Sequence, residues 1–351
     1  MKDVKALDRM AYLDVLRIFA AFSVVMLHSA AQFWYTLDIR STEWLIANSY
    51  DAVFRFGVPV FMMISGAVFL NPNYKVDVKR LYTHNIFRLA VIYIVWSCAY
   101  GLFDCIWLFG IKSMSIKEIL REMISGRYHL WFLPMIIGVY VLLPILKGWL
   151  ERAEKKDVKY FIVMFLLLQV GVETLRTLTV SDEIHSILDL TKVELVCGYV
   201  GYFVWGYYLA HVGIGAKWRK RILAGAIPAV GLNIVLGCVL TRKAGLTAPV
   251  IYDSFGVFTF IIATSLFLIC KNKITHKGGV MDKVVSEISA GTLGVYLMHI
   301  GVMEFTMCFG FHSKMMPNIV GIPIYAIACF AGCLLISAIL RRIPFVGRYI
   351  C

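Results

Sequence analysis

The chain has 351 residues, of which 60% are hydrophobic and 16% are charged, with a mean hydropathy of +0.76 and a net charge of +13. Soluble domains carry about a quarter charged residues, so this composition excludes a soluble enzyme and indicates an integral membrane protein. It also excludes disordered, collagen-like and coiled-coil proteins. The nine cysteines include no CxxC pair. They therefore predict small residues in apolar surroundings rather than a disulfide framework, and we expect no metal.

Ten apolar stretches approach the roughly 20 residues that a helix needs to cross the hydrocarbon core. They are Leu13–Phe33, Val53–Leu70, Ile86–Phe109, Leu130–Leu150, Tyr160–Leu178, Leu195–His211, Ile222–Leu240, Phe255–Cys270, Leu293–Phe311 and Val320–Leu340. The pattern predicts an all-α integral membrane protein, with a single transmembrane domain over residues 1–351 and both termini on one side. Only the connections Lys112–Tyr128 and Thr179–Glu194 leave room for further structure.

Loops rich in lysine and arginine alternate along the chain with loops that contain few of them. On the side of the N-terminus lie 23 of the 35 lysines and arginines, and 11 lie on the opposite side. Cytoplasmic loops carry the excess of positive charge, so we expect both termini in the cytoplasm and a multi-pass protein of the cell membrane. Topology and the lipid bilayer account for the net charge, and a nucleic-acid partner is not expected.

The first apolar stretch contains three ionisable residues, at a depth where charge is expensive and therefore indicates a site. Arg17 and His28 are 11 residues apart, which places them on one helix face about 16 Å apart along the axis. Asp14 precedes Arg17 by three residues and is predicted to pair with it. Such polar residues also argue that this stretch is retained rather than cleaved as a signal peptide. In the alternative, purely structural interpretation, Arg17 is an interfacial anchor and His28 forms a hydrogen bond with a neighbouring helix.

The second and third stretches meet in a basic loop. Pro59 and Gly66 weaken the second helix and can open backbone groups toward a cavity. The loop that follows ends with Lys79, Arg80 and Arg88. This cluster is explained equally by positive-inside anchoring and by a phosphate site made of guanidinium groups at a helix start.

Later segments carry more polar residues at membrane depth. Residues 198–208 alternate glycines with aromatic residues, as close helix packing requires. A histidine, His129, stands in an aromatic outer segment. The sequence leaves open which intramembrane acid orients a histidine: Asp104, Glu173 or Glu304. A polar stripe at helical spacing is predicted to face inward and consists of Ser289, Thr292, Tyr296 and His299.

Taken together, these motifs resemble the acyltransferase 3 family of ten-helix membrane acyltransferases. The resemblance covers nearly the whole chain, in family order. It is carried by Tyr12-Leu-Asp-Val-Leu-Arg17 with His28, Val-Pro59-Val-Phe61-Met-Met-Ile-Ser65-Gly66, the basic start of the third helix, His129-Leu-Trp131-Phe132-Leu, Tyr202-Phe203-Val-Trp-Gly206 and Ser289-Ala-Gly-Thr-Leu-Gly-Val-Tyr296-Leu-Met-His299.

The resemblance implies transfer of an acyl group, usually acetyl, from cytoplasmic acetyl-CoA to a hydroxyl of an envelope glycan or lipid-linked sugar. It carries function to Arg17 and His28, and to Arg88 as the second arginine of an Arg-x-x-Arg motif. The chain departs from the family at Asn85, where the first of those arginines is missing. Arg80 or Lys79 is the candidate to replace it.

Acyl transfer needs a base for the acceptor hydroxyl, donors for the oxyanion and a site for the CoA phosphates. His28 is the predicted base, since a neutral imidazole tolerates burial. Arg17, Arg80 and Arg88 are predicted to bind CoA, and the 16 Å between Arg17 and His28 suits its pantetheine arm. The predicted oxyanion donors are His299, Tyr296 and Ser65.

Two other functions stay open. Ten helices with intramembrane acids also suit a transporter of a small solute such as an amino acid, although the two halves show no repeat. An accessory membrane protein would leave the register of Arg17 and His28 unexplained. The sequence decides neither the acceptor nor whether the chain forms a homo-oligomer.

Overall fold

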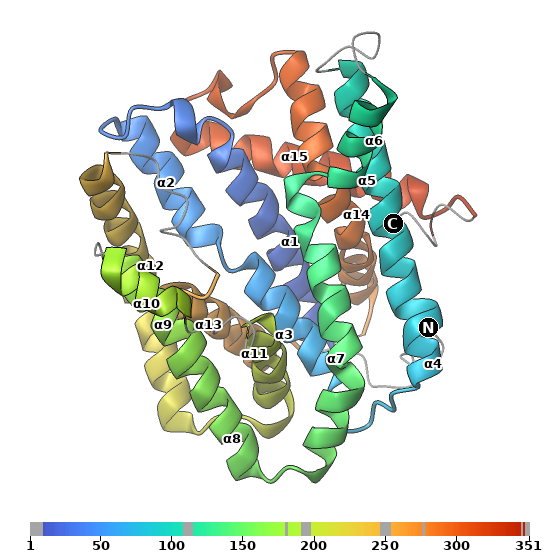
Figure 1. The fold of residues 1–351 in the computed structure, drawn as a ribbon, viewed down its shortest axis with the longest axis vertical. Helices are drawn as coiled ribbons and strands as arrows, with labels where there is room; N and C mark the ends of the chain where they lie inside the picture. The colour runs from blue at the N-terminus through green and yellow to red at the C-terminus, as the bar shows by residue number, and fades with distance from the viewer. Residues whose placement is uncertain are drawn as a thin grey trace.

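The computed structural model describes residues 10–107, 115–179, 182–190, 198–245, 254–275, 278–344 and 347, and within these ranges the chain is helical without strands. The α-helices are α1 Ala11–Ala31, α2 Thr42–Phe54, α3 Gly57–Phe69, α4 Val78–Arg80, α5 Phe87–Trp107, α6 Ile116–Ser125, α7 Phe132–Arg152, α8 Lys155–Met164, α9 Val172–Leu178, α10 Asp182–Leu190, α11 Gly198–Tyr207, α12 Ala216–Ala244, α13 Val257–Lys273, α14 Val280–Cys308 and α15 Asn318–Leu340. Shorter 3-10 and π segments join them (Figure 1).

The described residues contain eight helical segments that are long and apolar enough to cross a membrane. This confirms a multi-pass membrane protein. The remaining two predicted spans are helical as well, but α11 and α13 are shorter than the other eight segments. Residues 195–197 of the span predicted at Leu195–His211 lie outside the described ranges. The count of ten and the cytoplasmic termini stay predictions.

Several helices begin earlier than hydropathy predicts. Most of α2 precedes Val53, the predicted start of the second stretch, and its N-terminus is capped by the Ser41 side chain accepting from the Trp44 backbone N–H. Helix α14 begins at Val280, well before the predicted Leu293. In both cases polar turns precede the apolar stretch, so a hydropathy window misses them.

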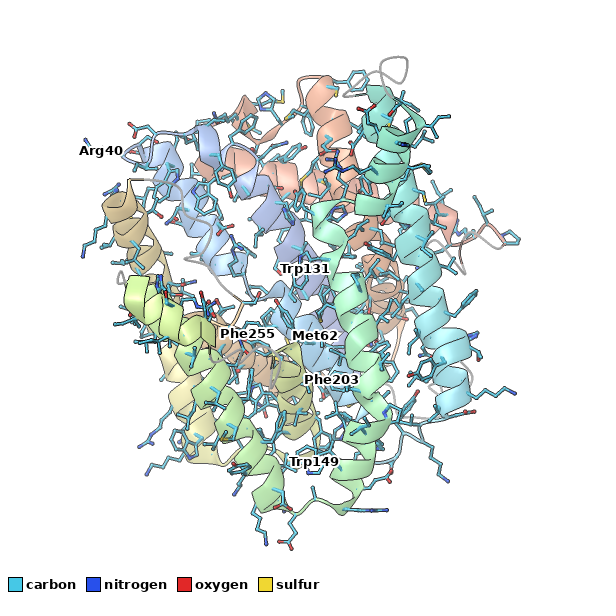
Figure 2. The ribbon with its side chains drawn as sticks, viewed as in Figure 1. Arg40, Met62, Trp131, Trp149, Phe203 and Phe255 are labelled. Carbon is cyan, nitrogen blue, oxygen red and sulfur yellow. The ribbon has the colours of Figure 1, made fainter. Side chains whose placement is uncertain are left out.

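Helix α1 lies at the centre of the molecule, between α2, α3, α14 and α15 (Figure 1). Its inner face carries Leu16 and Ala20, both fully buried, into the main hydrophobic core. Figure 2 shows Met62 of α3 and Phe203 of α11 in the middle of that core. The central position means that anything mounted on α1 is surrounded by protein on most sides.

Helices α3 and α11 cross with their backbones in contact. A methyl group built on Gly66 would lie 1.7 Å from the carbonyl oxygen of Phe203, and one on Gly206 would lie 2.0 Å from that of Met63. Only glycine permits this approach, which is the usual role of small residues between membrane helices. The close packing predicted for residues 198–208 is confirmed.

Two lysines, one in the last turns of α7 and one in the last turn of α13, bind carbonyl groups where other helices end. Lys147 donates from Nζ to the carbonyl oxygen of Asn71, just beyond α3, at 2.6 Å. Lys271 donates in the same way to Leu209 at 2.6 Å and Ala210 at 2.8 Å, in the π segment after α11. A helix C-terminus attracts cations, so these lysines stabilise the ends of the crossed pair.

Candidate active site

Three histidines meet near the end of α1. The ring centroid of His28 lies 5.1 Å from that of His299 on α14, and His129 lies 5.2 Å from His299 on its other side. Tyr128 covers His28 from the loop before α7, with centroids 5.7 Å apart. His28 is three residues before the end of α1, so the cluster lies toward one end of the bundle rather than at its middle.

Hydrogen bonds identify the protonated nitrogen in two of these rings. His299 Nδ1 lies 2.7 Å from the carbonyl oxygen of Tyr296, so Nδ1 must carry the hydrogen. His129 Nε2 faces the carbonyl oxygen of Leu297 at 3.4 Å and is the donor there. The opposite nitrogens, His299 Nε2 and His129 Nδ1, are buried without any hydrogen-bond partner. Each neutral ring therefore presents an unused acceptor inside the protein.

The predicted polar stripe on α14 is confirmed, because Ser289, Thr292, Tyr296 and His299 are all buried. The phenol of Tyr296 donates to the carbonyl oxygen of His129, and His299 donates to Tyr296 as described. In this structure two of the three donors predicted for the oxyanion, Tyr296 and His299, are thus engaged by backbone carbonyls, and the bond from Tyr296 holds the 3-10 segment that carries His129.

The intramembrane acids bind arginines. Asp104 of α5 and Glu304 of α14 both accept from Nη2 of Arg127, at 2.5 and 2.7 Å. Glu173 lies 3.6 Å from Arg176 within α9. The bridge through Arg127 joins α5 and α14 to the residue next to Tyr128, so it stabilises the loop from which Tyr128 and His129 project.

A further ion pair borders the cluster. Arg55, in the turn between α2 and α3, binds both carboxylate oxygens of Asp51 at 2.8 to 2.9 Å. Asp51 is buried, and the charge of Arg55 acts on His28. A bidentate pair holds the guanidinium in one orientation, which makes Arg55 a fixed cation at this end of α1.

Arg17 lies at the other end of α1. Its Nη1 is 3.2 Å from Asp14, which confirms the predicted pair, and Asp14 also accepts from the Ser289 hydroxyl at 2.8 Å. Ser65 contacts the Tyr140 hydroxyl, on which the charge of Arg17 acts. The structure therefore groups Ser65 with Arg17 rather than with His28.

The basic segment before α5 contains a π-helix at Leu81–Ile86. Eight residues of regular α-helix would turn Arg80 about 80° away from Arg88, but a π-turn accommodates about one extra residue and reduces the angle to about 20°. Arg80 and Arg88 are both half-buried, whereas Lys79 is exposed. The π-helix thus places Arg80 rather than Lys79 on the face of Arg88.

Sequence reasoning did not assign several residues of the cluster. The sequence identifies His129 only as a histidine in an aromatic segment. It assigns no role to Tyr128, Arg127 or Arg55. Their positions in the sequence could have identified them, because each lies within two residues of a motif or of the start of a membrane helix. Within the described ranges, no three His, Cys, Asp or Glu side chains are arranged to hold a metal ion.

An all-helical bundle with a buried histidine cluster on a central membrane helix defines the chain as a multi-pass membrane protein with a candidate catalytic site. Residues 10–338 match the family model described as an acyltransferase domain, so the chain belongs to the acyltransferase 3 family and is a membrane acyltransferase. The resemblance drawn from the sequence motifs is confirmed. No curated protein and no solved structure matches the chain.

Proposed function

We propose that this protein transfers an acetyl group from cytoplasmic acetyl-CoA to a hydroxyl of an envelope glycan or a lipid-linked sugar, in the cell membrane. The observation that carries the proposal is the geometry of α1. This helix is uninterrupted from Ala11 to Ala31, so Arg17 and His28 share one face about 16 Å apart. Acetyl-CoA has a charged nucleotide and a thioester separated by a long uncharged arm, and α1 offers a cation and a buried base at matching separation.

The donor end is formed by arginines. Arg17 carries one guanidinium on α1, and the π-helix brings Arg80 into register with Arg88 at the start of α5. Planar guanidinium groups bind phosphate oxygens bidentately, which an ammonium group cannot do. We assign the CoA phosphates to these three residues, with Arg80 in place of the arginine that the family pattern has at Asn85.

At the other end, His28 acts as the general base. Its neutral ring takes the proton of the acceptor hydroxyl while the oxygen attacks the thioester carbonyl carbon. The carbon–sulfur bond then breaks, and the CoA thiolate leaves with the proton returned from His28. Arg55 provides fixed positive charge near the oxyanion that forms between these steps.

We assign the acceptor side to an open cavity of about 360 Å³ lined by residues 314–318 and by two residues of the segments that follow α1. Its lining includes Glu43 and Lys314, and the ammonium group of Lys314 also lies 4.6 Å from the ring centroid of Phe33, five residues after His28. Charged and apolar groups together suit the hydroxyl edges and ring faces of a sugar. We propose that the acceptor reaches His28 from this side.

The first experiment tests the base. Membranes containing wild-type protein or His28→Ala receive acetyl-CoA with a radiolabelled acetyl group, and label is measured in the envelope glycan and lipid-linked sugar fractions. Loss of a general base costs about 10²–10⁴-fold, so His28→Ala should incorporate almost no label at equal protein level. Incorporation within a few-fold of wild type would remove His28 from the mechanism.

The second experiment tests the donor site. Arg17→Lys and Arg88→Lys keep the charge but lose the planar guanidinium group that binds phosphate bidentately. Both should therefore raise the KM for acetyl-CoA and reduce thermal stabilisation by CoA. Arg80→Gln should do the same, while the matched control Lys79→Gln should not. Equal behaviour of Arg80→Gln and Lys79→Gln would refute the register argument. Wild-type protein that CoA does not stabilise, but that takes up solute in proteoliposomes, would favour a transporter.

A further inference from the structure

The base in the proposed reaction needs a partner for its second nitrogen. A neutral imidazole that accepts the substrate proton on one nitrogen carries a hydrogen on the other, and that hydrogen requires an acceptor to fix the tautomer and to stabilise the imidazolium. Carboxylates usually play this role. Here Asp104 and Glu304 are bound to Arg127, and Asp51 is bound to Arg55.

His299 offers the missing acceptor. Its Nδ1–H donates to the Tyr296 carbonyl, which leaves the Nε2 lone pair for another donor. That nitrogen is buried without a hydrogen-bond partner, and the whole His299 side chain is inaccessible to solvent. A buried acceptor without a partner is costly, so its position beside the proposed base calls for an explanation.

The ring separation fits a bond between the two imidazoles. An N–H···N hydrogen bond of about 3 Å, extended by the two ring radii, places the centroids about 5 Å apart. The observed separation of His28 and His299 is 5.1 Å. A bond between the rings then requires that one N–H of the half-buried His28 ring be directed at His299 Nε2.

We propose that His299 is the positioning residue for His28, in a relay from His28 through His299 to the Tyr296 carbonyl; this inference rests on the proposed acyl transfer. His28 N–H donates to His299 Nε2, and the other nitrogen of His28 faces the acceptor hydroxyl. During transfer that nitrogen gains the hydroxyl proton and then gives it to the CoA thiolate. His299 stays neutral throughout, so protons and charge balance without a carboxylate.

The groups that face His28 are consistent with this assignment. His299 and Tyr128 border its ring, with centroids 5.1 and 5.7 Å away, and His129 and Arg55 also act on it electrostatically. Arginine is only a donor, so it cannot accept from His28. His129 also has an unused acceptor, but its ring packs against His299, Tyr100 and Tyr296. The histidine in close ring contact with His28 is His299, so the acceptor role is assigned to His299.

Two substitutions separate the relay from a structural role. In His299→Gln the amide reaches the place of Nε2 and can supply an acceptor there. In His299→Asn the shorter amide mimics Nδ1, keeps the bond to the Tyr296 carbonyl and leaves the Nε2 position empty. The relay predicts at least about tenfold higher acetyl transfer for His299→Gln than for His299→Asn, whereas a purely structural histidine predicts the reverse order.

The assay is label transfer from acetyl-CoA in membranes at saturating donor, measured from about pH 5 to pH 9, with CoA-dependent thermal stabilisation as the measure of folding. The relay predicts that His299→Asn lowers kcat about 10²-fold with little change in the KM for acetyl-CoA. It also predicts that the acidic limb of the rate profile moves about one pH unit lower, because the imidazolium of His28 loses a hydrogen bond. The control His185→Gln on α10, where the amide can replace the ring nitrogen that faces the Arg176 carbonyl oxygen, should behave as wild type.

The outcomes distinguish the relay from the function on which it rests. Wild-type membranes without label transfer would overturn the proposed function and the relay with it. Wild-type transfer that is lost in His28→Ala, with His299→Asn as active as His299→Gln and an unmoved acidic limb, would overturn the relay alone. If neither His299 variant is stabilised by CoA, the imidazole is a packing element and the relay is also overturned.

Discussion

The crossing of α3 and α11 provides the sharpest test of the fold. In Gly66→Ala the new methyl carbon would lie 1.7 Å from the Phe203 carbonyl oxygen, against about 3.4 Å for an ordinary contact. The obstructing atom is backbone, so it cannot rotate away. The two helices must therefore separate by more than an ångström or change their crossing angle, and the core around Met62 and Phe203 must loosen with them.

Inserting one methyl group into a packed core costs typically 1–3 kcal/mol, and a backbone obstruction belongs at the upper end of that range. We expect Gly66→Ala to destabilise the protein by about 3 kcal/mol, and Gly206→Ala, which meets the Met63 carbonyl at 2.0 Å, by a similar amount. The double variant should cost less than the sum, because one separation of the helices relieves both clashes.

Thermal unfolding of the purified protein in detergent micelles measures the effect. The matched control is Gly138→Ala in α7, where the added methyl group meets nothing within 4 Å. Alanine has the higher helix propensity by about 1 kcal/mol, so the control should raise the melting temperature slightly. A Gly66→Ala protein that melts with wild type or with the control would refute the close crossing.

Two further predictions follow from the ion pairs and the loops. Arg127→Ala leaves Asp104 and Glu304 facing each other without a cation; with partial exposure taken into account we expect a loss of about 2 kcal/mol of stability in thermal unfolding, part of which Glu304→Gln should restore in the double variant. A cysteine introduced as Lys155→Cys should resist a membrane-impermeant thiol reagent in intact cells and react after permeabilisation; labelling in intact cells would place this loop outside and contradict the ten-helix topology.

Much of the architecture is predictable because hydrophobicity and spacing act locally. Apolar length identifies the membrane helices, and helical periodicity predicts both the pair Asp14–Arg17 and the buried stripe that ends at His299. These features depend on residues within one helix. No neighbouring element has to be known to derive them.

The remainder depends on tertiary packing or on small backbone changes. The extra residue of the π-helix at Leu81–Ile86 has no distinct sequence signature, so the alignment of Arg80 with Arg88 could not be predicted. His129 joins His299 only because the 3-10 segment Tyr128–Trp131 packs against α14. The spacing of Ser65 within its motif likewise does not reveal that it lies beside Tyr140, at the end of the bundle occupied by Arg17.

Helix α1 is fastened to α14 at two heights. Near one end Ser289 bonds to Asp14, and near the other the rings of His28 and His299 are in contact. A helix that contacts the same neighbour near both ends cannot slide or tilt independently. The axial distance between Arg17 and His28 therefore stays fixed. In the proposed reaction, the arm of the donor would have to extend about 16 Å to bring its thioester to His28. Selection among acyl donors would then depend on the reach of the arm as well as on the chemistry of the acyl group.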